Sequence, residues 1–384
     1  MTKQNRETIC ITGMGVISAI GIGVEAFWQA LLKGESGAQS WEDLKDQGFR
    51  HTSAYRIPSF LSPLAHRGKR MAMQAADEAI QQAGLSMTKR IGVYVGTTMG
   101  ESGAFEEAAE GQGLTLSDAT GISFANSIRE AYQLQGPALA LGTACAAGNY
   151  AIGAGAQAIR RGLIDCAIVG GVDPFSRIAM AGFSRSRAMS PDVAAPFSAN
   201  RKGMVLGEGA AFLVLEPVGA AFNRGATVWA TVESLGLSCD AYHLTAPQPD
   251  GTGGMQAMQS ALKQANLLPE KIGWICAHGS GTRASDAMEA NAISQMFPNR
   301  SVAVSGIKGA IGHPLGAATA IEAVATALAL HHQILPPTIH CLVPDPACDI
   351  HLITKASPAL HLEWALNCGY AFGGLNSALL MGNI

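Results

Sequence analysis

Charged side chains are scarce in this sequence. Asp, Glu, Lys and Arg make up 14% of its 384 residues, and the formal net charge is −3. Neither nucleic acid nor a membrane surface is therefore indicated as a partner, because both attract proteins through a strong field of one sign. Hydrophobic residues make up 48% of the chain and glycine occurs 45 times. This composition favours a well-buried α/β enzyme over a disordered or fibrous chain.

Paired cysteines and long apolar runs are also missing. The eight cysteines include no CxxC pair, so no zinc or other metal site is expected, and we interpret them as reduced thiols of a cytoplasmic protein. Glycines between residues 13 and 23 break the N-terminal apolar segment, which fits strand, turn and helix better than a signal peptide. The most apolar later stretch, residues 309–330, contains His313, Pro314 and Glu322, so it is not a membrane span.

The chain repeats itself. The segments MQAADEAIQQAGLSMTK, from residue 73, and MQAMQSALKQANLLPEK, from residue 255, are identical at eight of seventeen positions. Both have helical periodicity and lead into an apolar strand that ends in small residues. Chance similarity between two Ala- and Gln-rich helices is the alternative, but the matching strand and turn favour duplication. We predict an α/β fold of five layers, α/β/α/β/α, built from two halves at residues 1–222 and 223–384.

Four reactive side chains stand where strands are predicted to end. Cys145 lies where an apolar strand turns into an Ala-rich helix, and His278 directly follows another strand. Lys308 and His313 lie in the glycine-rich turn GIKGAIGHPLG. Functional groups of α/β proteins gather at such strand ends and helix starts, so we expect the four to converge from both halves.

A thiol beside two neutral histidines suits thioester chemistry. A helix start stabilises a thiolate and offers N–H groups to an oxyanion, whereas burial raises the thiol pKa. Cysteine can take up an acyl group while histidines donate hydrogen bonds to an enolate, with no redox cofactor. A packing cysteine and structural histidines are the alternative interpretation of the same positions.

These motifs resemble those of the β-ketoacyl-[acyl carrier protein] synthases, condensing enzymes of the thiolase superfamily. They run nearly end to end in the family's order: ITGMGVIS, GTACAAG, VGGVDP, PFSANRKGMVLGEGAAFLVLE, AHGSGT, GIKGAIGHPLGAA and FGGLNS. The resemblance, closest to the elongating enzymes of fatty acid and type II polyketide synthesis, implies the duplicated thiolase-like fold. It also implies acyl transfer to Cys145 and decarboxylative Claisen condensation with a malonyl thioester. Both substrates would be carried on the phosphopantetheine of an acyl carrier protein, with no other cofactor.

The resemblance implies roles for individual residues. Cys145 is the nucleophile, His278 and His313 assist decarboxylation and stabilise the enolate, and Lys308 supports the histidines. Backbone N–H groups of Cys145 and Phe372 form the oxyanion hole. The implied supporting residues are Asp286, Glu289 (a structural acid that bonds near Lys308), the gating Phe372 and Gly373. The implied pantetheine and substrate contacts are Thr245, Ser280, Thr282 and Met99.

Partners follow from the same resemblance. The residues implied to dock an acidic carrier protein are Arg67, Lys69, Arg70, Arg201 and Lys202, for which a solvated basic run is the alternative. A dimer is implied, either of two identical chains or with a chain-length-factor-like subunit. Residues 97–132 would then line the acyl pocket across its interface.

Three positions depart from the family pattern. Ser198 and Lys202 stand where acids are usual, and Ala371 stands where the gate has glycine. Because Ala tolerates fewer backbone conformations than Gly, restricted or altered gate motion is expected. A specialised polyketide or polyene pathway is thus an alternative to ordinary fatty acid elongation.

Other functions stay open at this stage. A chain-length-factor-like partner subunit keeps the fold without the activity, although such subunits usually lack the nucleophilic cysteine. A thiolase-like enzyme would use a second cysteine near the gate, for which Cys368 is the candidate. The segment TGMGVISA is a weak sign of a dinucleotide oxidoreductase, since the third glycine of that motif is missing. A non-enzymatic scaffold leaves the four convergent polar residues unexplained.

Overall fold

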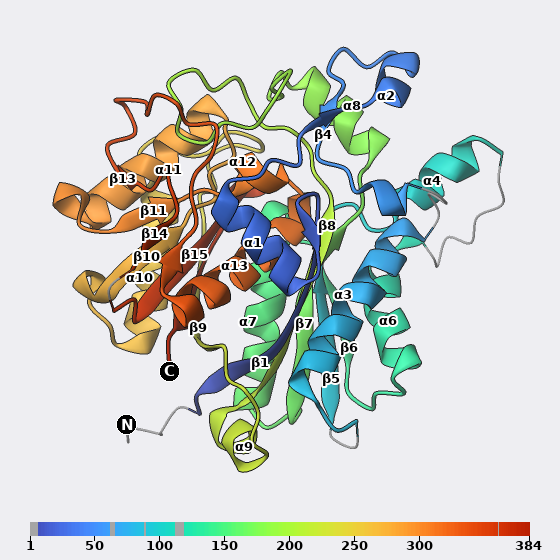
Figure 1. The fold of residues 1–384 in the computed structure, drawn as a ribbon, viewed down its shortest axis with the longest axis vertical. Helices are drawn as coiled ribbons and strands as arrows, with labels where there is room; N and C mark the ends of the chain where they lie inside the picture. The colour runs from blue at the N-terminus through green and yellow to red at the C-terminus, as the bar shows by residue number, and fades with distance from the viewer. Residues whose placement is uncertain (1–6, 62–65, 88–89, 112–118, 360) are drawn as a thin grey trace.

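The fold is described by a computed structural model for residues 7–61, 66–87, 90–111, 119–359 and 361–384. Its main sheet has the strand order β13-β11-β10-β15-β16-β9-β1-β8-β7-β5-β6 (Figure 1), and the pairs β3-β4 and β12-β14 form two small separate sheets. The N-terminal part consists of β1 (Ile9–Ser18), β5 (Ile91–Gly96), β6 (Ala138–Leu141), β7 (Cys166–Asp173) and β8 (Gly209–Pro217). The C-terminal part consists of β9 (Ala230–Cys239), β10 (Ile272–Cys276), β11 (Ala303–Ser305), β13 (His351–Leu352), β15 (Trp364–Ala371) and β16 (Leu375–Gly382). The two parts join where β1 pairs with β9, with Cys10 opposite Thr231.

The two parts of the sheet have the same topology. Outward from the junction, the order β1-β8-β7-β5-β6 corresponds strand for strand to β9-β16-β15-β10-β11. In each part the first two pairings are antiparallel and the last two are parallel. The predicted duplicated fold is therefore confirmed. The division between residues 222 and 223 stays a prediction.

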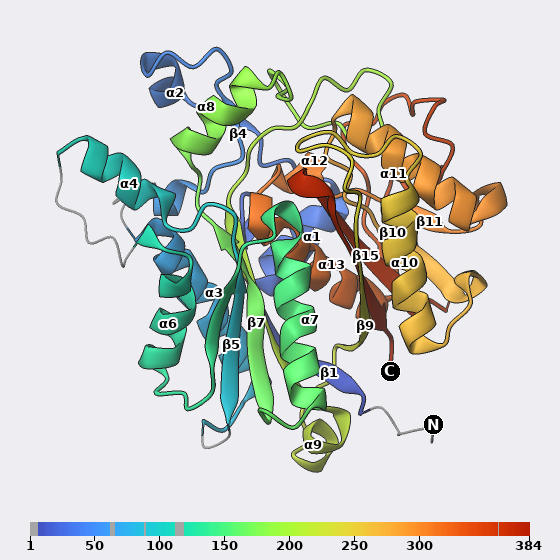
Figure 2. The ribbon, with the colours of Figure 1, turned by 180° about the vertical axis from the view of Figure 1, so that it is seen from behind.

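Helices cover and separate the two parts of the sheet. Helices α7 (Ala147–Arg160) and α13 (Ala318–His332) lie between them (Figures 1 and 2). Helices α3 (Arg67–Ala83) and α6 (Ile122–Ala131) cover the outer face of the N-terminal part, and α10 (Thr252–Ala265) and α11 (Arg283–Met296) cover that of the C-terminal part. The five predicted layers are therefore present. Every residue of α13 from Ala318 to Leu330 is buried, as its apolar sequence requires of a helix enclosed on all sides.

The two central helices begin side by side. A Cβ on Gly148 would lie 2.5 Å from the backbone nitrogen of Ala320, so only glycine permits this close approach. The backbone N–H of Asn149 donates to Thr319 Oγ1 at 2.9 Å, and the Asn149 side chain donates to the Asn367 carbonyl at 3.0 Å. This buried network brings the start of α7, which follows Cys145, to the start of α13, which follows His313.

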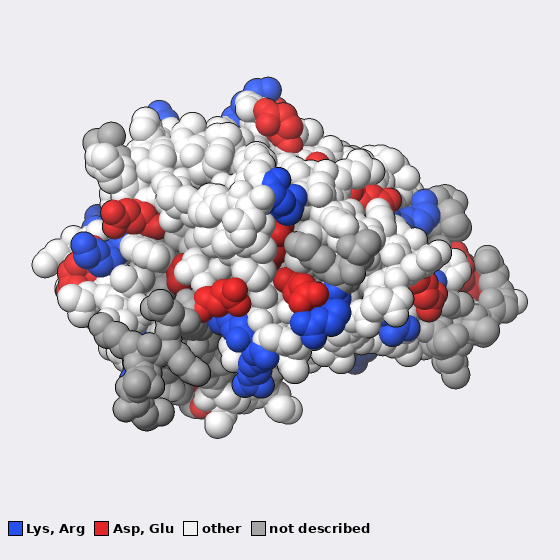
Figure 3. Space-filling view, turned by 90° about the horizontal axis from the view of Figure 1, so that it is seen from below, with Lys and Arg blue, Asp and Glu red and all other residues white. Residues whose placement is uncertain are grey.

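Shorter elements complete the chain. They are β2 (Gly21–Ile22), α1 (Val24–Lys33), β3 (Gln39–Ser40), α2 (Glu42–Asp46), β4 (Ser53–Ala54), α4 (Ser102–Ala109), α8 (Arg177–Arg185), α9 (Val218–Asn223), α12 (Lys308–Ile311), β12 (Ile334–Leu335) and β14 (Ser357–Pro358). None of the helices in the described ranges combines the length and apolarity needed to cross a membrane. On the described part of the face in Figure 3, acidic and basic side chains lie interspersed on a mostly uncharged surface.

Candidate active site

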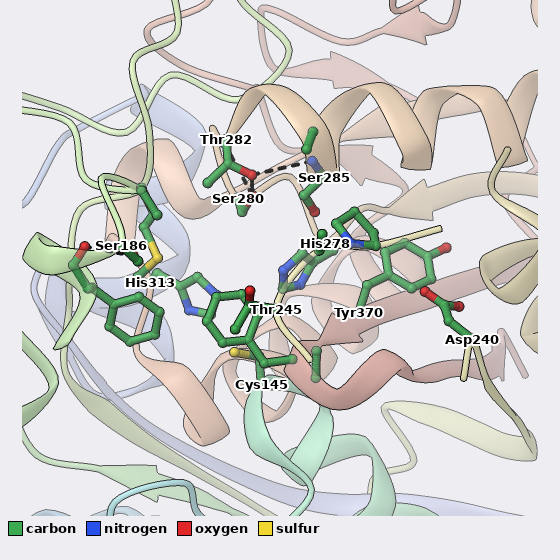
Figure 4. A pocket seen from close by; sticks show the side chains of 18 of the residues that line it. Cys145, Ser186, Asp240, Thr245, His278, Ser280, Thr282, Ser285, His313 and Tyr370 are labelled. Atoms are coloured by element: carbon green, nitrogen blue, oxygen red, sulfur yellow. Dashed lines mark hydrogen bonds between the residues drawn. The ribbon is translucent and has the colours of Figure 1, made fainter. Parts of the chain in front are cut away.

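Cys145 lies at a sharp turn between β6 and α7. It occupies the short 3₁₀ turn Ala144–Ala146, and Ala144 adopts the left-handed conformation with φ of 48°. This turn directs the thiol into a pocket shared with His278 and His313 (Figure 4), and 8% of Cys145 remains exposed. The predicted strand-to-helix position of Cys145 is therefore what the structure shows.

His278 follows β10 and is held through its backbone. The N–H groups of His278 and Gly279 donate to the two carboxylate oxygens of Glu289 at 2.7 and 2.8 Å. The His278 ring nitrogen Nδ1 lies 3.4 Å from Lys308 Nζ. An ammonium group can only donate, so Nδ1 accepts this bond and the ring proton resides on Nε2.

His313 reaches the same pocket from the turn after α12. Its backbone N–H donates to the Val205 carbonyl at 2.8 Å, and its Nδ1 accepts from the Leu315 N–H at 3.2 Å. The proton of this imidazole therefore also resides on Nε2. The ring centroids of His278 and His313 are 5.3 Å apart with an interplanar angle of 75°. The pocket thus holds one thiol and two imidazoles that each offer one N–H.

Lys308 pairs with an acid that the sequence analysis did not select. Its Nζ lies 2.5 Å from Glu322 Oε1 and also donates to the His278 carbonyl oxygen, whereas Glu289 bonds to backbone N–H groups. Glu322 was not selected as a site residue. The sequence did indicate that Glu322 needs a partner, because it is an acidic residue inside the apolar segment 309–330, where an unpaired charge would be costly.

Burial sets the protonation states of the pocket. It raises the pKa of the Cys145 thiol to about 12, with the Lys308 charge acting in the opposite direction. Burial, followed by the Lys308 charge, holds the pKa of both His278 and His313 well below the ordinary value. At neutral pH the pocket therefore contains a protonated thiol and two neutral histidines. Burial is therefore the largest of the effects on the Cys145 thiol.

The predicted substrate contacts divide into two groups. Thr245, Ser280 and Thr282 line the pocket together with Cys145 and the histidines (Figure 4). Met99 does not line it, but packs in the apolar cluster that includes Cys145, and its backbone N–H donates to Asp173 at 2.9 Å. Part of the predicted acyl-pocket segment 97–132, namely residues 112–118, lies outside the described residues.

The segment predicted as a gate forms one wall of the pocket. Phe372 is 41% exposed, and its ring centroid lies 5.6 Å from that of Phe183 on α8. Ala371 has an ordinary extended conformation with φ of −127°, whereas Gly373 and Gly374 have φ of 83° and 74°. In this conformation the glycines are required after Phe372 and not at residue 371. The effect of Ala371 on gate motion stays a prediction.

Two buried carboxylates support the surrounding loops. Asp286 accepts backbone N–H groups of Phe197 and Gly281 at 2.7 and 3.0 Å. Asp173, which the sequence analysis placed in a motif without assigning it a role, accepts the N–H of Met99 at 2.9 Å and that of Gly316 at 2.6 Å. Asp173 therefore connects the loop after β5 to the turn that carries His313.

Two predicted docking residues are wrong because they are buried. Arg67 is 1% exposed and forms an ion pair with Glu208. Arg201 is 3% exposed, and its guanidinium lies 2.5 Å from Asp345 and 3.6 Å from Asp286. The acids that pair with Arg201 thus come from other segments than the motif positions occupied by Ser198 and Lys202. Side chains that are buried and ion-paired inside the protein cannot contact the surface of a partner.

The other predicted docking residues are at least partly exposed. Lys202 is exposed, 3.7 Å from Asp192, and Lys69 and Arg70 are half-buried on α3. Arg185, Arg187 and Arg283 are exposed next to the pocket-lining residues Ser186 and Ala284. The sequence analysis missed these three, since a lone arginine in a polar segment does not show that it borders a pocket.

The thiolase-like alternative required a second cysteine in the pocket. Cys368 is fully buried in the core that β15 forms with α10 and α11, and it is not among the pocket-lining residues. Among the described residues, no group of three or more His, Cys, Asp or Glu side chains could hold a metal ion. The geometry thus supplies one thiol and two histidines.

Comparisons with known proteins identify the family of the chain. A family model described as "Beta-ketoacyl synthase, N-terminal domain" matches residues 6–221, and one described as "Beta-ketoacyl synthase, C-terminal domain" matches residues 229–342. The chain belongs to the β-ketoacyl synthase family. This β-ketoacyl synthase is accordingly a condensing acyltransferase, which confirms the predicted family and enzyme class.

Its relatives include a 3-oxoacyl-[acyl-carrier-protein] synthase and ketosynthases described with a chain length factor. It is 34% identical to 3-oxoacyl-[acyl-carrier-protein] synthase 2 of Staphylococcus aureus (strain COL), covering 98% of each chain. It is 35% identical to a chain of the ishigamide ketosynthase/chain length factor, covering 99% and 100% of the two chains with a TM-score of 0.92. It is 28% identical to a chain of the ketosynthase ApeO in complex with its chain length factor ApeC from Xenorhabdus doucetiae, covering 100% of each with a TM-score of 0.85.

Proposed function

We propose that this β-ketoacyl synthase transfers an acyl group from a carrier protein to Cys145 and condenses it with a malonyl carrier-protein thioester. The observation that carries the proposal is the convergence of Cys145, His278 and His313 in one pocket, with both imidazoles presenting Nε2–H. The product is a 3-oxoacyl thioester on the carrier protein, and the carbon dioxide released comes from the malonyl group.

Acyl transfer is the first half-reaction. Cys145 Sγ attacks the thioester carbonyl carbon, the carbon–sulfur bond to phosphopantetheine breaks, and the thiol proton ends on the leaving sulfur. The backbone N–H group of Cys145, just before α7, and that of Phe372, in the segment after β15, donate to the carbonyl oxygen and stabilise its developing negative charge. Because burial keeps the pKa of the resting thiol high, proton removal accompanies the attack instead of preceding it.

Condensation is the second half-reaction. The malonyl thioester carbonyl oxygen accepts hydrogen bonds from Nε2–H of His278 and His313. The bond to the carboxylate then breaks, carbon dioxide leaves, and the electron pair forms an enolate that these donors stabilise. The enolate carbon attacks the acyl carbonyl on Cys145, and the thiolate leaves and regains a proton. Lys308 keeps the His278 proton on Nε2 by donating to Nδ1.

An acidic carrier protein requires a basic surface near the pocket entrance. The exposed Arg185, Arg187 and Arg283 adjoin pocket-lining residues, so they replace the buried Arg67 and Arg201 in our docking proposal. Exposed charges of this kind chiefly raise the rate of productive encounter. Lys69, Arg70 and Lys202 remain secondary candidates.

A second β-ketoacyl synthase-like chain is the other proposed partner. The edge strand β6 has a 47% exposed Leu139, and it leads directly into the turn that bears Cys145. A partner paired along this edge would bury the apolar strand, as a dimer does. Two of the structural relatives are ketosynthases described with a chain length factor, which supports a heterodimer as an alternative to a homodimer.

The chain-length-factor function is the second candidate for this chain itself. The same two relatives favour it, because each includes a chain length factor of related fold. The presence of Cys145 in a complete pocket favours the catalytic subunit instead. Fatty acid synthesis and specialised polyketide synthesis are both candidate pathways, because the relatives include a 3-oxoacyl-[acyl-carrier-protein] synthase and a ketosynthase described with a chain length factor.

Intact-mass spectrometry after mixing the protein with a set of acyl-carrier proteins tests the proposal. We expect an acyl mass increment on the wild type that is absent from Cys145→Ala. The matched control is Cys239→Ala, because Cys239 is an exposed cysteine that would take up label non-specifically. Acylation that persists in Cys145→Ala, or none in the wild type with any acyl group, would overturn the catalytic assignment in favour of the partner subunit.

A further inference from the structure

Tyr370 is a tyrosine in the pocket wall whose hydroxyl makes no hydrogen bond of normal geometry with the described residues, although it interacts with the thiol of Cys368, a weak acceptor. It ends β15 just before the gate residues Ala371 and Phe372, and it is 5% exposed. Buried hydroxyl groups are normally satisfied, because an unmade hydrogen bond in the interior is costly. A purely packing role would be met more stably by phenylalanine.

The ring of Tyr370 lies against His278. The two ring centroids are 6.0 Å apart with an interplanar angle of 67°, and His313 faces His278 at 5.3 Å. His278 is therefore flanked by an aromatic ring on either side. Since Lys308 fixes only the Nδ1 edge of His278, these two rings determine how the plane of the imidazole is tilted toward the pocket.

The hydroxyl of Tyr370 lies on the other end of the ring, toward Asp240 (Figure 4). Both side chains pack on consecutive glycines at the start of α10. A Cβ on Gly254 would lie 3.3 Å from Tyr370 Oη, and a Cβ on Gly253 would lie 1.8 Å from Asp240 Oδ1. The hydroxyl and the carboxylate therefore both lie against the start of α10, at two neighbouring residues that have no side chain.

Asp240 can accept a further hydrogen bond. Its oxygens take the Asn376 side chain at 2.6 Å and the Gln248 N–H at 3.1 Å, whereas a carboxylate offers about four acceptor positions. Burial raises the pKa of the Tyr370 hydroxyl well above its ordinary value, with smaller contributions in the same direction from Cys368, by its charge and a side-chain hydrogen bond, and from Glu289 and Asp240. The hydroxyl therefore remains a donor throughout the neutral range.

We propose that Tyr370 is a positioning residue for His278: its ring supports the imidazole, and its hydroxyl donates to the Asp240 carboxylate when a pantetheine arm occupies the pocket. Asp240 itself lines the pocket and holds the segment that leads to Thr245, so a bound arm has a direct route to it. The bond fixes the Tyr370 ring and, through it, the tilt of His278 during decarboxylation. This inference rests on the proposed function.

Two substitutions separate the hydroxyl from the ring. Tyr370→Phe removes only the hydroxyl, and Tyr370→Leu removes the aromatic support of His278. Tyr94→Phe is the matched control, because Tyr94 is a buried tyrosine on β5 that does not line the pocket. Three quantities are measured for each protein: the melting temperature, the rate of Cys145 acylation and kcat for malonyl decarboxylation.

We expect decarboxylation to respond selectively. In Tyr370→Phe, kcat for decarboxylation falls about tenfold, the effect of one lost hydrogen bond of ordinary strength. Its Cys145 acylation rate stays within about twofold of wild type and its melting temperature is equal or higher, because a buried hydroxyl without a hydrogen bond of normal geometry is gone. Tyr370→Leu loses more decarboxylation than Tyr370→Phe, and Tyr94→Phe changes neither rate.

The outcomes are distinguishable. A Tyr370→Phe protein that decarboxylates at the wild-type rate overturns the inference, as does a parallel loss of both rates and melting temperature, which is the signature of a purely structural residue. A wild type that is never acylated at Cys145 overturns the proposed function and the inference with it. Full acylation of every variant with selective loss of decarboxylation supports both.

Discussion

The Nζ atom of Lys308 lies 2.5 Å from Oε1 of Glu322, and both side chains are fully buried. The pair connects the turn that carries His313 to α13, and Lys308 also donates to the His278 carbonyl. Burial raises the pKa of Glu322 to about 7, while Lys308 acts to lower it. The charge that orients His278 is therefore tolerated in the core because an acid from the next helix neutralises it.

Glu322→Gln is expected to destabilise the fold. The substitution leaves the Lys308 ammonium buried without its counter-charge, and breaking such a pair typically costs about 3–5 kcal/mol. Urea unfolding at neutral pH measures the loss. The control is Glu35→Gln, which breaks the exposed Lys33–Glu35 contact of 3.9 Å and should leave stability unchanged. Equal stabilities for the two variants would show that Lys308 does not depend on Glu322.

The pH dependence of stability should report the buried histidines. The pKa of His313 is lowered by burial and by Lys308, so below about pH 6.5 the unfolded chain takes up a proton that the native state refuses. Native stability therefore falls as the pH falls, with a limiting slope of about 1.4 kcal/mol per pH unit for each such histidine.

Comparison of wild type with His313→Asn isolates this effect. Carboxyl groups whose pKa is raised by burial, such as Glu289 with a pKa of about 8, affect stability in the opposite direction. Their folded form holds a proton that the unfolded form has lost, so they favour the native state as the pH falls. They are common to both proteins and cancel in the difference. Urea unfolding from pH 7.5 to 5 should show a shallower acid loss for His313→Asn. Parallel curves would mean that His313 titrates normally in the fold.

Arg187→Glu should weaken carrier-protein recognition without affecting the fold. Reversing an exposed charge beside the pocket entrance is expected to raise KM for an acyl-carrier protein about tenfold, with little change in kcat or melting temperature. The effect should diminish as salt is added. Arg161→Glu, an exposed change at the far end of α7, provides the comparison. If both variants raise KM alike, docking does not occur at this entrance.

Arg201→Ala should act on stability, because Arg201 is internal. The guanidinium contacts Asp345 and the backbone carbonyls of Thr282 and Arg283, so its removal leaves several acceptors unpaired. The expected loss is about 3 kcal/mol or more in urea unfolding. Lys202→Ala, the adjacent exposed position, serves as the matched control and should have no such effect. A folded Arg201→Ala protein of wild-type stability with a raised carrier KM would restore the docking role.

Part of the site could be predicted because the positions of its residues depend on the local sequence. Cys145 and His278 follow a strand and His313 follows the short helix α12 after β11, each within a run of small residues, and strand ends are where open α/β folds collect functional groups. The repeated helices at residues 73 and 255 likewise predicted two halves, and the matching strand orders show them. The local sequence pattern was sufficient for these predictions, because the backbone geometry of such turns favours these residue types.

Other assignments failed because charge does not reveal exposure. Arg67 belongs to a basic run typical of a surface, yet Glu208, far along the chain, draws it into the core. Arg201 is buried by Asp345 in the same way, and Glu322, which pairs with Lys308, was not selected from the sequence. A buried ion pair needs two partners at contact distance, and sequence alone does not bring distant segments together.

The sequence by itself predicted the duplicated α/β fold, since periodicity and turn composition are local properties, and its motifs resemble those of the β-ketoacyl synthase family. Only the tertiary structure decided how the site residues act. It buries Cys145 so that its pKa is about 12, places both imidazole protons on Nε2, and sets Tyr370 between His278 and Asp240. Protonation and orientation depend on burial and on partners from distant segments, and these exist only once the two halves have packed together.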